Sequence, residues 1–111
     1  MTSRPSHVLV VGATGGIGRL VVEQALADGY AVRGLVRNEQ RSRLLPAGAE
    51  AVVGDVSRPE TLDAAVEGID AVVFTHGSHG SKADMEAVDY GGVRSVLAAV
   101  GDRPMRVVLM T

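Results

Sequence analysis

The 111-residue sequence contains no cysteine, which excludes disulfide bonds and thiolate chemistry. It has no basic run and a formal net charge of -2, so we expect no general attraction to nucleic acid or to anionic lipid. No apolar run approaches the length that crosses a membrane, and the polar residues 1–7 do not have the form of a signal peptide. These absences predict a soluble, cytoplasmic protein without a nucleic-acid or membrane partner.

Hydrophobic residues make up 46% of the sequence and charged residues 22%, which predicts a single globular domain over residues 1–111. Apolar runs alternate with segments of helical periodicity, a pattern typical of parallel sheets with helical crossovers. We expect five strands, at residues 8–11, 31–36, 51–53, 69–74 and 106–110. The predicted fold is therefore α/β, a Rossmann-type doubly wound parallel sheet with strand order 3-2-1-4-5.

Four helices are expected between these strands. The first ends at Gly29, and its predicted apolar face consists of Ile17, Leu20, Val21, Ala25 and Leu26. A short helix is expected over residues 39–45, and a third opens with a Ser57-x-x-Glu60 capping box and buries Leu62, Ala65 and Val66. The fourth ends at Gly101, and its predicted apolar face consists of Met85, Val88, Gly92, Val93, Val96, Leu97 and Val100.

Three glycines join the first strand to the first helix. Gly12 allows a tight turn, Gly15 leaves room for a phosphate near the backbone, and Gly18 allows the helix to pack close to the strand. Free N–H groups would converge there at the positive end of the helix, which predicts a pyrophosphate site; a merely tight turn is the alternative. No Gly-Lys-Ser/Thr follows, which excludes a mononucleotide P-loop. The residues expected at this site are Gly12, Thr14, Gly15, Gly16, Ile17 and Gly18.

The end of the second strand carries an arginine and no acidic residue before Glu39. In this fold an acid at that place holds the ribose hydroxyls of NAD, whereas an arginine suits the 2′-phosphate of NADP. Arg37 is therefore the candidate for the 2′-phosphate, and NADP is expected over NAD. Its possible helpers are Arg33, Arg41 and Arg43, and the alternative is a solvated basic surface.

Two further loops are expected at the same edge of the sheet. After the third strand, the Asp55 carboxylate could accept from the amine of adenine while the N–H of Val56 donates to the ring; alternatively, Asp55 only helps the chain to turn. After the fourth strand, His76 and His79 lack a Cys, Asp or Glu at ligand spacing, so no metal site is predicted. His76 as a proton donor to a substrate is kept as a hypothesis.

Several stretches together resemble the NAD(P)-binding, NmrA-like group of atypical short-chain dehydrogenase/reductases, which is close to the flavin and biliverdin reductases. The matching stretches are Gly12-Ala-Thr-Gly-Gly-Ile-Gly18, residues 29–37, Gly54-Asp-Val56, Val88-Asp-Tyr90 and residues 106–111. The resemblance implies a cofactor domain in which Thr75, His76 and Gly77 back the nicotinamide ribose. It also implies that residues 1–111 are the N-terminal part of a longer domain, because full-length relatives continue beyond the fifth strand.

The usual catalytic pair of that superfamily, Tyr-x-x-x-Lys, is absent. The single lysine, Lys82, does not follow a tyrosine at that spacing, and Tyr90 falls within the fourth predicted helix. Asp89 stands about where extended members carry an asparagine. The catalytic residues are therefore unknown from the sequence.

The resemblance implies an NADPH-dependent reductase that passes hydride to an unidentified small acceptor. A non-catalytic NADP sensor is the alternative from another class, and a sugar-nucleotide-type epimerase or dehydratase is a weaker one. The fifth strand would carry apolar side chains on both faces and an unpaired edge, so self-association through this edge is also expected.

Overall fold

The computed structural model describes residues 7–55, 58–75 and 92–109. A five-stranded parallel sheet forms its centre, in the order β3-β2-β1-β4-β5, as the sequence predicted. The strands are β1 (His7–Val11), β2 (Ala31–Val36), β3 (Glu50–Val53), β4 (Ala71–Phe74) and β5 (Arg106–Leu109). The helices are α1 (Gly16–Ala27), α2 (Asp63–Val66) and α4 (Gly92–Val100), with the 3₁₀ turns η1 (Glu39–Leu44) and η2 (Pro59–Thr61).

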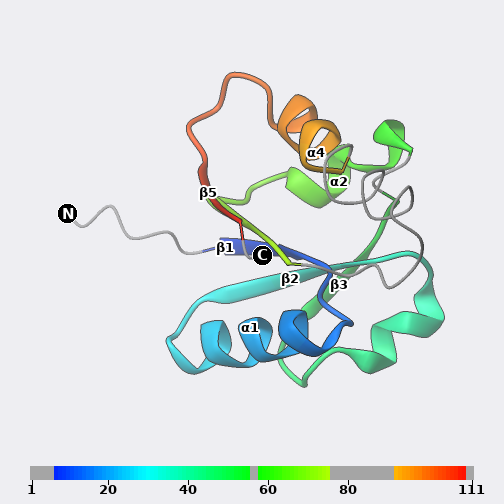
Figure 1. Ribbon diagram of the computed structural model, residues 1–111, viewed down its shortest axis with the longest axis vertical. Helices are drawn as coiled ribbons and strands as arrows, with labels where there is room; N and C mark the ends of the chain where they lie inside the picture. The colour runs from blue at the N-terminus through cyan, green and yellow to red at the C-terminus, as the bar shows by residue number, and fades with distance from the viewer. Residues whose placement is uncertain (1–6, 56–57, 76–91, 110–111) are drawn as a thin grey trace.

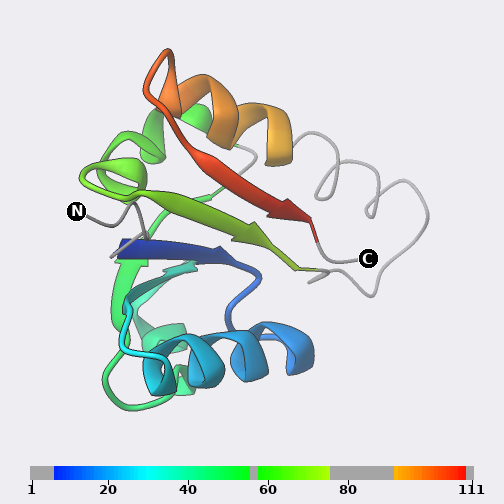
Figure 2. The same cartoon turned by 90° about the vertical axis from the view of Figure 1, so that its left-hand side faces the viewer.

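Helices cover both faces of the sheet. Figures 1 and 2 show α1 on one face, and α2 and α4 on the other. β1 supplies both cores: Leu9 and Val11 belong to the cluster under α2 and α4, whereas Val8 and Val10 belong to the cluster under α1. Because successive side chains of a strand point to opposite faces, a strand covered on both sides must be apolar throughout.

The inward face of α1 differs from the predicted one. Ile17 is 47% exposed and Leu20 is 65% exposed, so the prediction that they face the sheet was wrong. Gly18 and Val22 are buried instead, and the predicted positions Val21, Ala25 and Leu26 are partly buried against the sheet. The close approach of Gly18 to the end of β1 fixes the rotation of the helix, and that rotation turns Leu20 outward.

The remaining connections are shorter than the pattern suggested. The segment expected as a helix over 39–45 is the 3₁₀ turn η1, and the third helix consists of η2 followed by the single turn α2. Leu62, Ala65 and Val66 are buried, as predicted. β4 begins at Ala71 rather than at residue 69. The capping residue Ser57 and the apolar positions Met85 and Val88 lie outside the described residues.

β5 lies at the edge of the sheet and pairs with β4. Two of its apolar side chains are open to solvent, because Val107 is 40% exposed and Val108 is 44% exposed. Self-association through this edge stays a prediction. Among the described residues, no helix has the length and apolar character to cross a membrane.

Candidate nucleotide site

Loops that are distant in the sequence meet at the carboxyl edge of the sheet. The N–H of Thr75, just after β4, donates to the carbonyl of Val11 at 3.0 Å. The N–H of Gly54, just after β3, donates to the carbonyl of Val36 at 2.8 Å. These bonds align the ends of four strands, so the loop after β1, Arg37, the Gly54 turn and Thr75 all lie at one edge. Ligands of open α/β sheets bind outside this edge.

The loop after β1 is shaped by two glycines with different requirements. Gly12 has φ +86°, a conformation that side chains disfavour. Gly18 has no such backbone conformation, but a Cβ placed on it would lie 1.8 Å from the carbonyl oxygen of Gly12. The N–H of Gly15 donates to that same oxygen at 3.1 Å. The predicted close packing of helix and strand at Gly18 is therefore present.

The first turn of α1 has N–H donors that no side chain of the described residues caps. Gly15 is the N-cap residue without a side-chain hydrogen bond, and no acidic residue occupies the first turn. The N–H of Arg19 makes the first helical bond, 2.9 Å to the carbonyl of Gly15. Preceding N–H groups of a helix have no intrahelical acceptor, and they sit at its positive end. Gly16, Ile17 and Gly18 therefore present donors beside the half-buried Thr14, an arrangement suited to an anion.

Arg37 is exposed directly after the carboxyl end of β2. Among residues 7–55, 58–75 and 92–109, no partner makes a hydrogen bond or ion pair with its guanidinium. It stands where the sequence placed a 2′-phosphate ligand. Arg41 and Arg43 are exposed nearby in the chain, on η1.

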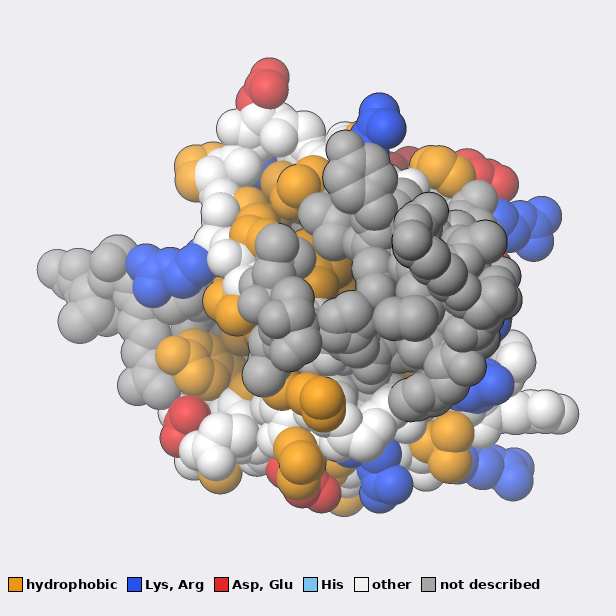
Figure 3. Space-filling model, in the orientation of Figure 1, with side chains coloured by type: hydrophobic (Ala, Val, Ile, Leu, Met, Phe, Trp, Pro, Cys, Tyr) orange, Lys and Arg blue, Asp and Glu red, His pale blue; other side chains and the backbone are white. Residues whose placement is uncertain are grey.

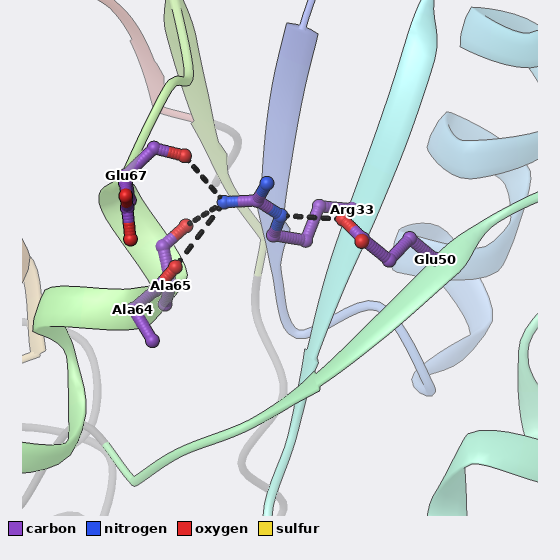
Figure 4. A network of polar contacts seen from close by, with 5 residues as sticks. All are labelled: Arg33, Glu50, Ala64, Ala65 and Glu67. Atoms are coloured by element: carbon purple, nitrogen blue, oxygen red, sulfur yellow. Dashed lines mark hydrogen bonds and ion pairs between the residues drawn. The ribbon is translucent and has the colours of Figure 1, made fainter.

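Arg33 does not reach this edge, and its proposed role as a helper is not supported. Arg33 lies three residues before Val36, the last residue of β2. At the rise of about 3.3 Å per residue in a strand, its backbone is about 10 Å from the carboxyl edge. Its Nε donates to Glu50 at 2.7 Å. Its Nη1 lies within 3.3 Å of three carbonyl oxygens at the end of α2, those of Ala64, Ala65 and Glu67. Figure 4 shows the guanidinium between β3 and this helix end.

Arg103, which follows α4 in the chain, also donates a hydrogen bond at this end of α2. Its Nη2 donates to the carbonyl of Val66 at 2.9 Å, and its Nε donates to Val100 at 3.3 Å. Two arginines thus satisfy carbonyls of a four-residue helix. Neither contact was predicted, because nothing in the local sequence links an arginine to a helix end more than 30 residues away.

The turn after β3 is held by a threonine that sequence reasoning missed. The hydroxyl of Thr61 accepts from the N–H of Asp55 at 2.8 Å and lies 2.7 Å from the carbonyl of Arg58. The N–H of Arg58 donates to the carbonyl of Asp55 at 2.8 Å. This supports the alternative in which Asp55 shapes a turn, and it leaves the adenine prediction open. Val56 lies outside the described residues.

The predicted positions after Thr75 also lie outside the described residues, namely His76, Gly77, His79, Lys82, Asp89 and Tyr90. In the part of the chain that is described, no group of three or more His, Cys, Asp or Glu residues could hold a metal ion. On the face drawn in Figure 3, described Arg side chains are spread around the outline with acidic side chains among them.

The parallel sheet and the glycine turn into α1 define a Rossmann-type domain of the dinucleotide-binding class. A family profile described as NAD(P)H-binding matches residues 12–111. The chain belongs to this NAD(P)H-binding family. The expected relation to the short-chain dehydrogenase/reductase superfamily is confirmed by similar solved structures.

One relative is named photosystem II assembly factor Ycf39, from Trieres chinensis. It is 45% identical over 94 residues, which are 83% of this chain and 30% of that protein. A short-chain dehydrogenase/reductase superfamily protein from Agrobacterium tumefaciens with bound NAD has a TM-score of 0.73 at 30% identity, covering 93% of this chain and 31% of that one. The Citrobacter triphenylmethane reductase complexed with NADP(H) has a TM-score of 0.66 at 30% identity, covering 84% and 32%. This chain thus spans about a third of each.

Proposed function

We propose that this chain is the NADP(H)-binding domain of a reductase that passes hydride to a small acceptor. The observation that carries the proposal is the uncapped first turn of α1 beside Gly12, with Arg37 exposed at the end of the neighbouring strand. The N–H groups would hold the pyrophosphate, and Arg37 would pair with the 2′-phosphate. The NADP(H) complex of the triphenylmethane reductase is in line with this choice, whereas the NAD complex of the Agrobacterium protein favours the other cofactor.

The domain's own residues would bind and orient the dinucleotide. The nicotinamide supplies the hydride, and the protein supplies its position relative to the acceptor. In this proposal the nicotinamide half would lie beyond the carboxyl ends of β1 and β4, where the family resemblance places it.

A second function, a dinucleotide sensor that changes partners when NADP binds, has one observation in its favour. The relative from Trieres chinensis is named for assembly rather than for turnover. Steady oxidation of NADPH with a flavin or a quinone as acceptor, measured in the natural full-length protein, favours the reductase. Dinucleotide binding without turnover favours the sensor.

Calorimetric titration with NADPH and NADH tests the cofactor choice. A charge-assisted hydrogen bond contributes about 1.5 to 3 kcal/mol, so Arg37→Ala should weaken NADPH binding roughly tenfold to a hundredfold and leave NADH binding nearly unchanged. Arg106→Ala is the matched control. Arg106 is also exposed, but it is the first residue of β5 and therefore lies at the amino ends of the parallel strands, away from the carboxyl edge. Equal weakening of both cofactors by Arg37→Ala would show that Arg37 does not select NADP.

A further inference from the structure

Thr75 is a buried polar residue, which the family resemblance places behind the nicotinamide ribose of the cofactor. It is 7% exposed, and it directly follows β4 at the carboxyl edge. Its Oγ1 lies 2.9 Å from the carbonyl oxygen of Val11 and 3.2 Å from that of Gly12. A threonine hydroxyl has one hydrogen, so these two carbonyls share or alternate as its acceptors.

Three contacts of the glycine loop converge on the carbonyl oxygen of Gly12. This oxygen accepts hydrogen bonds from the N–H of Gly15 at 3.1 Å and from the Thr75 hydroxyl at 3.2 Å. It also lies against the backbone of Gly18. Thr75 also occupies the space beside Gly12: a Cβ on Gly12 would lie 2.4 Å from Oγ1 and 2.9 Å from the Thr75 carbonyl oxygen. The side chain of Thr75 therefore packs beside Gly12 on the inside of the turn and hydrogen-bonds to the backbone carbonyls there.

We propose that Thr75 is a positioning residue for the anion site, acting through the Gly12 peptide rather than by touching the nicotinamide ribose. This inference rests on the proposed function. Orientation of the Gly12 peptide sets the path of the chain into α1, and that path aims the N–H groups of the first turn. The hydroxyl fixes the peptide in advance of binding, so less ordering remains when the anion arrives.

This role makes a prediction that differs from that of a direct contact. The pyrophosphate is common to NADPH, NADH and ADP, so a misdirected loop weakens all three by the same factor. A contact to the nicotinamide ribose would affect NADPH and NADH alone, since ADP lacks that half. An effect on cofactor selectivity is not expected, because selectivity belongs to Arg37 in the proposed function.

The experiment is calorimetric titration of Thr75→Val and Thr75→Ser with NADPH, NADH and ADP, with circular dichroism to verify the fold. Valine keeps the shape of threonine but places a methyl group against two carbonyl oxygens. Loss of a neutral hydrogen bond predicts weaker binding of all three ligands by about threefold to tenfold. Thr75→Ser keeps the hydroxyl and should bind each ligand within about twofold of the parent chain, which separates hydrogen bonding from packing.

Two results would overturn the inference: unchanged binding of all three ligands by Thr75→Val, or weaker binding of NADPH and NADH with ADP unaffected. If the parent chain binds none of the three, the proposed function fails by itself. In that case, the hydrogen-exchange rate of the Gly15 amide, compared between the parent chain and Thr75→Val, tests the role of Thr75. Faster exchange in Thr75→Val supports its hold on the loop, and an unchanged rate refutes it.

Discussion

Replacing Gly18 by alanine tests how tightly α1 must approach the end of β1. The new Cβ would lie 1.8 Å from the Gly12 carbonyl oxygen and 2.7 Å from its carbon. Backbone atoms must therefore retreat by more than an ångström, since such contacts are not tolerated below 3.0 Å. Overpacking costs about 1 to 3 kcal/mol, and the obstacle here is backbone that cannot rotate away. The intrinsic helix preference of alanine offsets at most about 1 kcal/mol of this.

We therefore expect Gly18→Ala to lower the free energy of unfolding by about 2 kcal/mol, measured by urea denaturation. The displaced carbonyl also loses its alignment with the Gly15 N–H, so NADPH binding should weaken at least about tenfold, or 1.4 kcal/mol. Gly16→Ala is the matched control, because a Cβ at Gly16 meets nothing within 4 Å. This variant should be as stable as the parent chain, or more stable by about 0.4 to 1 kcal/mol.

The comparison separates close packing from a general sensitivity of the first helical turn. If Gly18→Ala unfolds at the parent urea concentration and binds NADPH equally well, the contact between Gly12 and Gly18 does not shape the loop. If Gly16→Ala is destabilised as much as Gly18→Ala, the cause is something other than the space at position 18.

Two predictions concern the polar contacts that hold the connections in place, and both are measured by urea denaturation. Arg33→Met should lower the free energy of unfolding by about 2 kcal/mol, because three carbonyls at the end of α2 lose a charged donor. Glu50→Gln, its control, should cost less than about 1 kcal/mol, since the Glu50 side chain is 65% exposed; an equal loss in both variants would assign the effect to the ion pair. Thr61→Val should cost about 1 to 2 kcal/mol, because the part-buried N–H of Asp55 loses its acceptor, and no loss would mean that water replaces the hydroxyl.

The sequence by itself determined the order of elements, the strand order and the position of the glycine loop. The elements and the loop follow from local chemistry, and the strand order follows from the rules for connections in parallel α/β sheets. A strand covered on both faces needs a continuous apolar run, as in residues 8–11, and a positive φ at the strand-to-helix turn needs Gly12. Arg37 could be placed at the carboxyl edge for the same reason, because the end of a predicted strand fixes the edge at which its next residue lies.

Only the tertiary structure decided which way each element turns and which polar groups meet. Ile17 and Leu20 have the spacing of a buried face, but the contact between Gly18 and Gly12 sets the rotation of α1 and leaves them exposed. Arg33 resembles its neighbouring arginines in sequence, yet its partners come from β3 and from residues more than 30 positions away. The Thr75 hydroxyl meets Gly12 across 63 positions. Periodicity and motif spacing describe short segments, so they do not determine which side chains from distant segments meet.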